Sequence, residues 1–246
     1  MLAAMRVTDD TDPVEEWHKH CRELSRVSSW LNSLELKNLH ITSELGTDIT
    51  LELVEGHIWT SAGDMGSSPS SVPYVANMPT EEIFTDPHKY TANGTAYGSR
   101  PLLINGKLVR GFSITFKDGK AVDCHAEENE ALLRAQLFRD ERSCYLGEVA
   151  LVSKRSPLAQ MDQVFCCGLL DENSVSHMAF GQSFSTNVKG GTDMTDEELE
   201  ALGVNVANNH NDFMIGTPEF HVVGTTKTGE SVVIMDHGEF TLEAEE

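Results

Sequence analysis

The chain has 246 residues, which is long enough for one large domain or two small ones with a sizeable buried core. Its formal net charge is −21, from 18 Lys and Arg against 39 Asp and Glu, and this charge disfavours nucleic acids and anionic membranes as partners. No apolar run approaches the length of a transmembrane helix, and the N-terminus lacks the pattern of a secretory signal. The five cysteines form no CxxC pair, which is typical of free thiols in a reducing cytosol, so we expect a cytoplasmic protein without disulfides.

The first predicted element is a helix over residues 13–36. Asp12 can cap its N-terminus and Pro13 suits its first turn. Apolar residues then recur at spacings of three or four, as expected for a helix with one buried face. His18 and His20 lie off this apolar stripe, so both are expected to be solvated.

The rest of the chain reads mainly as β-structure. The Asn105-Gly106 and Asp118-Gly119 pairs predict hairpin turns inside a β-meander. Residues 60–73 read as a Ser/Gly/Pro-rich loop. Further helices are expected at 127–139, over 171–184 and at 195–202. Further strands are expected at 39–42, 48–53, 147–152, 212–216, 219–223 and 231–235. Mostly β with a few helices predicts an α+β fold with a largely antiparallel or mixed sheet.

Four short patches carry candidate metal ligands. Glu172 lies five residues before His177, and a His210-Asn211-Asp212 patch follows further on. Glu148 begins an apolar run, where an ionised carboxylate needs a partner. The pair Glu81-Glu82 follows a proline turn. Each patch alone is more often an ordinary surface or loop feature, and the remaining histidines are expected to be surface or locally satisfied groups: His40, His57, His88, His125, His221 and His237.

If these patches converge, they supply three Glu, one Asp and two His. One ion needs four to six donors, so such a carboxylate-rich set suits two ions that share a bridging carboxylate. Two divalent cations about 3.5–4 Å apart can hold a hydroxide between them and polarise a carbonyl. Glu82 would then be a ligand and Glu81 a general base. In an extended strand, however, neighbouring side chains point to opposite sides, so a turn after Pro79 would have to bring both to the site.

Taken together and in order, these segments resemble the thermophilic-type aminopeptidases, the AmpS/PepS family of bacterial metallopeptidases. The resemblance covers nearly the whole chain. The segments that carry it are Asp12-Pro13-Val14, Gly46-Thr47-Asp48-Ile49-Thr50, Glu55-Gly56-His57-Ile58-Trp59, Met78-Pro79-Thr80-Glu81-Glu82-Ile83-Phe84-Thr85, Leu146-Gly147-Glu148-Val149-Ala150-Leu151-Val152, Leu170-Asp171-Glu172-Asn173, His177 and His210-Asn211-Asp212-Phe213-Met214-Ile215-Gly216.

The resemblance implies a cytoplasmic exopeptidase that removes N-terminal residues from peptides. It implies that the enzyme uses two divalent ions, which can be zinc, cobalt, manganese or magnesium. It also implies a metal shell and, by similarity, a homodimer whose active sites face an internal space. The residues carried over as ligands are Glu82, Glu148, Glu172, His177, His210 and Asp212, with Glu81 favoured as base.

Two features depart from the family pattern. Family members are longer, with an N-terminal α/β domain, so residues 1–246 read as the C-terminal catalytic domain, in which residues 1–36 form a helix that continues from, or replaces, that domain. The family usually carries a tyrosine seven residues after the histidine at 177, and here that position is Phe184. Three hypotheses follow: an active aminopeptidase, a metal-binding peptide-interaction module with weak or no peptidase activity, and a different two-metal hydrolase.

Overall fold

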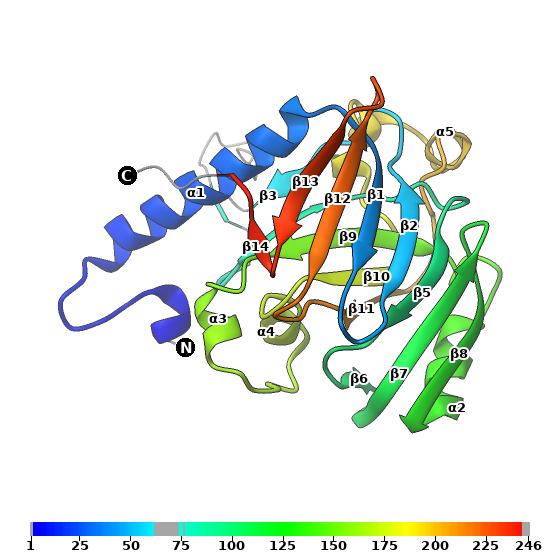
Figure 1. Cartoon of the computed structure of the whole chain (residues 1–246), viewed down its shortest axis with the longest axis horizontal. Coiled ribbons are helices and arrows are strands. Elements are labelled where there is room, and N and C mark those ends of the chain that lie inside the picture. The colour runs from blue at the N-terminus through cyan, green and yellow to red at the C-terminus, as the bar shows by residue number, and fades with distance from the viewer. Residues whose placement is uncertain (1, 62–73, 76, 243–246) are drawn as a thin grey trace.

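The computed structural model describes residues 2–61, 74–75 and 77–242, which form two antiparallel β-sheets with helices at their edges (Figure 1). The larger sheet contains β1 (Leu36–Thr42), β2 (Asp48–Glu52), β5 (Asn93–Tyr97), β6 (Leu102–Ile104), β7 (Lys107–Lys117), β8 (Lys120–Glu128), β12 (His221–Thr226), β13 (Ser231–Asp236) and β14 (Glu239–Phe240). The smaller sheet contains β3 (Thr60–Ser61), β4 (Glu82–Thr85), β9 (Leu146–Val152), β10 (His177–Gly181) and β11 (His210–Met214). The helices are α1 (Pro13–Ser33), α2 (Glu130–Leu137), α3 (Pro157–Gln160), α4 (Gly168–Glu172) and α5 (Asp196–Ala201).

The strand order places β9 at the centre of the smaller sheet. That order is β11-β10-β9-β4-β3, and the larger sheet runs β14-β13-β12-β1-β2-β5-β7-β6 with β8 paired to β7. Every strand pair between these elements is antiparallel. The predicted α+β class is therefore confirmed.

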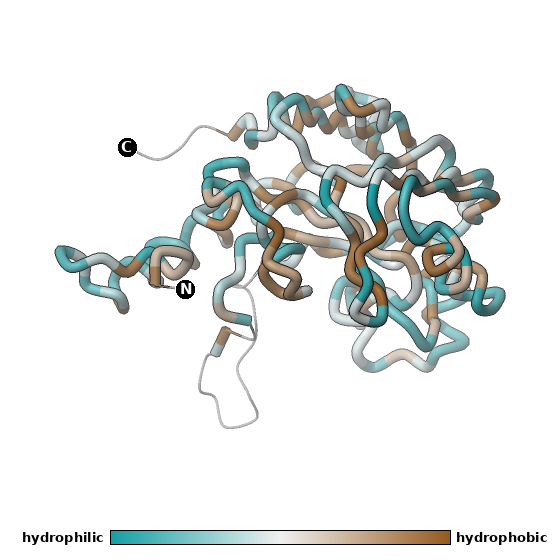
Figure 2. Tube along the Cα trace, turned by 90° about the horizontal axis from the view of Figure 1, so that it is seen from below, coloured by the Kyte–Doolittle hydropathy of each residue, from teal (hydrophilic) through white to brown (hydrophobic). Residues whose placement is uncertain are grey.

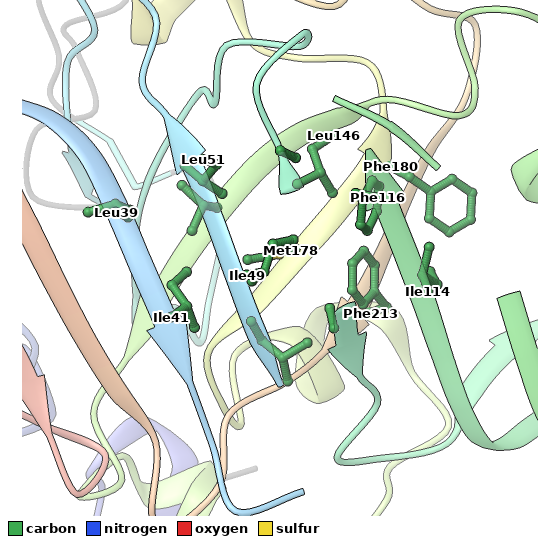
Figure 3. Close-up of a cluster of buried hydrophobic side chains, with 14 of the residues drawn as sticks. Leu39, Ile41, Ile49, Leu51, Ile114, Phe116, Leu146, Met178, Phe180 and Phe213 are labelled. Atoms are coloured by element: carbon green, nitrogen blue, oxygen red, sulfur yellow. The ribbon is translucent and has the colours of Figure 1, made fainter. Parts of the chain in front are cut away.

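The main core lies between the two sheets. Leu39 and Ile41 on β1 face Met178 and Phe213 on the smaller sheet, and each of these side chains is buried (Figure 3). Figure 2 shows hydrophobic stretches of the trace running through the middle of the molecule, whereas the outer turns are mainly hydrophilic. Burial of these apolar side chains stabilises the stacking by roughly 25 cal/mol for each Å² removed from water.

Helix α1 begins as its sequence predicts. The Asp12 carboxylate accepts hydrogen bonds from the N–H groups of Val14 and Glu15, at 2.9 and 3.1 Å. The expectation that His20 is solvated was wrong. Its side chain is only 7% exposed, and its Nε2 lies 2.6 Å from the carbonyl oxygen of Thr80. This contact joins α1 to the segment just before β4.

The hairpin turns were predicted correctly, but one helix was not. Asn105 and Asp118 each take a positive φ ahead of a glycine, as tight hairpin turns require. The expected helix over 171–184 is absent: α4 ends at Glu172, and His177 begins strand β10. The strand expected at 212–216 begins two residues earlier, at His210, and is strand β11. Of the predicted loop at 60–73, residues 62–73 lie outside the described part of the chain, and residues 60–61 form β3.

Candidate metal centre

Strand register brings five of the six candidate ligands to one face of the smaller sheet. Ala179 on β10 pairs with Glu148 on β9 and with Asp212 on β11, and directly paired residues point to the same side. Alternation along each strand adds His177 and His210 to that side. Glu82 joins them, because its strand partner Val152 lies four residues after Glu148 on the same face.

The two imidazoles present the same nitrogen to this face. His177 Nδ1 donates to the carbonyl oxygen of Val175 at 3.2 Å, and His210 Nδ1 donates to that of Gln182 at 2.7 Å. Each backbone contact leaves Nε2 directed at carboxylates. A metal-binding histidine is normally held in this way, with its second nitrogen fixed by a hydrogen bond.

The ligating atoms form two groups that share one carboxylate. His177 Nε2 lies 3.2 Å from Glu82 Oε2, and His210 Nε2 lies 3.1 Å from Glu148 Oε2 and 3.0 Å from Asp212 Oδ1. Within each of the groups Glu82-Glu148-His177 and Glu148-His210-Asp212, one atom per residue lies within 4.8 Å of the others. Glu148 belongs to both groups, which is the arrangement expected of a carboxylate that bridges two ions.

Glu172 reaches the cluster from outside the sheet. It is the last residue of α4, and its side chain lines the same cleft as the other five candidates. The neighbouring Asn173 is fully buried, and its Nδ2 lies 3.3 Å from Glu172 Oε1. The Asn173 Oδ1 also accepts a hydrogen bond of 2.7 Å from the N–H of Glu81. Asn173 therefore connects the α4 segment to the chain that leads into β4.

The charges of the cluster favour a cation. Burial raises the pKa of Glu148 to about 7. Burial, reinforced by the negative charge of Asp212, raises the pKa of Glu172 to about 8. Burial alone would lower the pKa of His177 and His210, but hydrogen-bonded carboxylates raise these pKa values to about 10 and about 11. The raised pKa values mean that bound protons balance the negative charge of carboxylates gathered in a poorly hydrated site. Divalent ions could replace these protons. The donor set therefore fits metal ions.

The cluster lies in a cleft of about 830 Å³ with one apolar wall. Trp59, Phe84 and Phe184 contribute to this wall. The Phe184 ring packs against the rings of Phe84 and His210, with centroid distances of 5.5 and 5.0 Å. Position 184 therefore does lie beside the candidate ligands, where a side-chain hydroxyl would be close to the cluster.

Glu81, expected as the general base, does not face the cleft. Its carboxylate accepts two hydrogen bonds from the Arg6 guanidinium, at 2.6 and 2.8 Å, and lies 3.7 Å from His20 Nε2. It lines a separate cavity of about 230 Å³ together with these two residues. Strand alternation thus sends Glu81 and Glu82 to opposite sides, and no turn after Pro79 brings both to the site. The interpretation of Glu81 as base does not fit this geometry, because a base must lie within hydrogen-bond reach of its proton donor.

Two buried residues near the cluster were not singled out from the sequence. In the sequence, Asn173 appears only as the last residue of a segment that carries the family resemblance. Asp86, just after β4, is fully buried and accepts a hydrogen bond of 3.2 Å from the N–H of Phe184. Burial raises the pKa of Asp86 well above its usual range. No local pattern distinguishes Asp86, because its importance comes from a contact with a residue 98 positions away.

Comparison with known proteins assigns the chain to a family. Residues 1–240 match the family described as thermophilic metalloprotease (M29). The chain belongs to this family. Aminopeptidase 2 of Geobacillus stearothermophilus is 40% identical over 243 residues, which are 98% of this chain and 58% of that protein. Aminopeptidase AmpS of Bacillus subtilis is 38% identical over 238 residues, or 97% and 57% of the two chains. The resemblance found in the sequence is thereby confirmed.

A solved structure also supports this M29 assignment. Wild-type AmpT from Thermus thermophilus superposes with a TM-score of 0.87 at 37% identity, over 94% of this chain and 56% of that one. A 2,5-dihydroxypyridine dioxygenase from Pseudomonas putida KT2440 shares the fold alone, with a TM-score of 0.61 at 13% identity. The chain therefore spans somewhat more than half the length of the relatives it matches. No described helix is long and apolar enough to cross a membrane.

Proposed function

We propose that this M29 chain carries the catalytic centre of a two-metal aminopeptidase, with Glu82, Glu148, Glu172, His177, His210 and Asp212 as the ligands. The observation that carries the proposal is the pair of ligand groups that share Glu148 on one face of the smaller sheet. Zinc, cobalt, manganese and magnesium are all compatible with mixed carboxylate and imidazole donors. When bound, such ions polarise a scissile carbonyl and lower the pKa of water.

The cleft provides the groups that would recognise a peptide N-terminus. Four carboxylates and two imidazoles line it, and a carboxylate oxygen that binds no ion can accept hydrogen bonds from an α-ammonium group. The aromatic wall that includes Phe84 and Phe184 fits an apolar side chain of the N-terminal residue. Together these surfaces would hold the first residue of a peptide with its carbonyl beside the ligand cluster.

Glu81 has a different role in this proposal. Its ion pair with Arg6 holds the peptide segment that ends in Glu82, so Glu81 positions a ligand and does not take a proton from the reaction. His20 supports the same segment through its contact with Thr80.

The test combines metal content with activity on one sample of the full chain. We expect the cleft ligands to bind two ions per chain, and we expect hydrolysis of leucine-type chromogenic amides in the presence of zinc, cobalt, manganese or magnesium. Glu148→Gln should reduce both quantities, because it removes the shared ligand charge. Two ions bound by the cleft ligands without turnover under any of these metals would refute the aminopeptidase and favour the second function.

That second function is a metal-binding peptide-interaction module, and Phe184 is the observation that favours it. Phenylalanine keeps the ring contacts to Phe84 and His210 but cannot donate a hydrogen bond into the cleft. Loss of one such donor reduces rates by roughly 10²–10³ in comparable sites. Peptide binding without turnover, measured by calorimetry on the zinc-loaded chain, would support this function.

The remaining expectations stay proposals. They are a cytoplasmic location, a homodimer, and the interpretation of residues 1–246 as a C-terminal catalytic domain. A different two-metal hydrolase is distinguished by a panel of ester and amide substrates that lack a free amino terminus.

A further inference from the structure

A second group of potential metal ligands lies outside the cleft, at the end of the larger sheet. His221 is the first residue of β12 and Glu219 lies in the turn before it, whereas Asp236 is the last residue of β13 and His237 lies in the turn after it. We call these four residues the hairpin cluster. From the sequence, His221 and His237 were expected only to be surface or locally satisfied groups. None of the four lines the cleft of the candidate metal centre.

The two imidazoles of the hairpin cluster are neighbours. Their ring centroids are 4.9 Å apart, with the ring planes inclined at 69°. His237 Nδ1 lies 2.6 Å from Glu219 Oε2, and His221 Nε2 lies 4.0 Å from the same oxygen. Ligands of a tetrahedral ion with bonds of about 2.0–2.1 Å lie about 3.3 Å apart, so the two distances bracket the required spacing. Glu219, His221 and His237 thus offer three atoms that lie within 4.8 Å of one another.

The fourth residue supplies the contact that a metal-binding histidine normally has. Asp236 Oδ1 lies 2.7 Å from His221 Nδ1, so this carboxylate accepts the Nδ1 proton and leaves Nε2 directed toward Glu219. A carboxylate that orients the ring of a ligand in this way also increases its basicity.

We propose that the hairpin cluster binds one divalent transition-metal ion, such as zinc, through Glu219, His221 Nε2 and His237 Nδ1, with Asp236 orienting His221 and water completing the shell. Mixed imidazole and carboxylate donors suit zinc, copper and nickel better than calcium or magnesium. The site is open, because the side chains of Glu219 and His237 are 52% and 56% exposed. It is independent of the ligands proposed for the catalytic function.

The backbone holds these side chains in place before any ion binds. The N–H of Gly238 donates to the carbonyl oxygen of Phe220 at 2.8 Å, which joins the turn after β13 to the start of β12. His237 itself has a φ of 47°, a left-handed conformation that histidine, like asparagine and aspartate, adopts more often than other non-glycine residues do. With this backbone conformation, the His237 ring lies beside the His221 ring.

Two other surface histidines each form an ion pair with a single carboxylate. His40 lies 2.7 Å from Asp48, and His125 lies 2.9 Å from Glu130. Each is a single imidazole with a carboxylate, whereas the hairpin cluster brings two imidazoles within reach of one carboxylate oxygen. These pairs therefore provide matched controls.

The test counts zinc ions on the full chain by native mass spectrometry and titration calorimetry, with zinc alone as the probe. The hairpin variant carries His221→Gln and His237→Gln, and the control variant carries His40→Gln and His125→Gln. We expect the hairpin variant to bind one zinc ion fewer than the wild type, and the control variant to bind the same number as the wild type. Equal zinc counts in all three proteins, or an equal loss in both variants, would overturn the proposal.

A single variant covers the case in which the double variant does not fold. Glu219→Gln keeps the size of the side chain and removes its charge, and we expect it to weaken this zinc ion by about tenfold or more. Unchanged zinc affinity in Glu219→Gln would also overturn the proposal. Because this site is separate from the cleft, loss of aminopeptidase activity in Glu148→Gln would leave its zinc ion in place, so failure of one proposal can be distinguished from failure of the other.

Discussion

Replacing Asn173 with alanine should weaken metal binding at the cleft by more than its effect on folding explains. Asn173 is fully buried and contacts both chain segments that bring ligands to the cluster from outside β9–β11. Its Oδ1 accepts from the N–H of Glu81 at 2.7 Å, and its Nδ2 donates to Leu169 at 3.0 Å and lies 3.3 Å from Glu172 Oε1. The substitution removes these contacts and leaves the buried N–H of Glu81 without its acceptor.

The magnitude follows from these contacts. An unsatisfied buried N–H costs about 1–3 kcal/mol of folding free energy. For a chain of this size, a loss of about 2 kcal/mol lowers Tm by roughly 4–8 °C. Loss of a group that orients metal ligands typically costs 10–100-fold in metal affinity. We therefore expect Asn173→Ala to weaken zinc binding by that factor, measured by competition with a chelator of known affinity.

A matched variant separates the two effects. Leu133→Ala leaves a cavity in the core beneath α2 and should cost about 2–5 kcal/mol, because Leu133 is completely buried. Leu133 does not line the cleft, so zinc affinity should stay unchanged in the folded variant. Zinc binding by Asn173→Ala as tight as that of the wild type, or an equal weakening in Leu133→Ala, would refute a role of Asn173 in positioning the ligands.

Three further predictions concern the cleft and the segment beside it. Phe184→Tyr should raise kcat by roughly 10²-fold with little change in KM, because it adds a donor to the cleft; an unchanged kcat would show that the phenol is not what limits turnover. Glu81→Gln should lower the free energy of unfolding by about 1–3 kcal/mol. This is less than the cost of breaking a fully buried ion pair, because the Arg6 side chain is 24% exposed. It should keep kcat within about fivefold, whereas loss of a base costs 10²–10⁴-fold. The metal-free chain should lose thermal stability as pH rises, and the zinc-loaded chain should lose less. The folded state raises the pKa of Glu172 from 4.5 to about 8 and that of His177 from 6.5 to about 10. The contribution of each group to folding stability therefore falls as pH rises, between pH 4.5 and 8 for Glu172 and between pH 6.5 and 10 for His177. A Tm of the metal-free chain that rises over this range would contradict this prediction.

The sequence predicts best those elements whose signals are local. Asp12 and Pro13 mark the start of α1, and the Asn105-Gly106 pair marks a hairpin. The error at 171–184 has a physical cause. Strand β10 is buried on both faces, so His177–Gly181 shows no alternation of polar and apolar residues that would identify a strand. Helix α4 stops at Glu172, because Asn173 directs its side chain to Leu169 and Glu81.

The candidate ligands could be selected from the sequence only as a set, through the family resemblance. Nothing near Glu148 in the sequence indicates which partner neutralises it, since that partner, His210, lies 62 residues away. The opposite orientations of Glu81 and Glu82, by contrast, follow from strand alternation alone. The ion pair that takes up Glu81 depends on Arg6, which is 75 residues distant, and no local pattern predicts it.

The geometry of the ligand face is set from the opposite face of the same sheet. Val149, Met178 and Phe213 pair across β9, β10 and β11 and are buried in the core between the sheets. A register shift of one residue would turn Glu148 into that core, at a cost far above the hydrophobic gain of the shifted strand. Apolar packing therefore fixes where the carboxylates lie before any ion binds. It follows that the electrostatic cost of gathering these carboxylates is offset by the core, and that metal binding relieves this cost without having to organise the sheet.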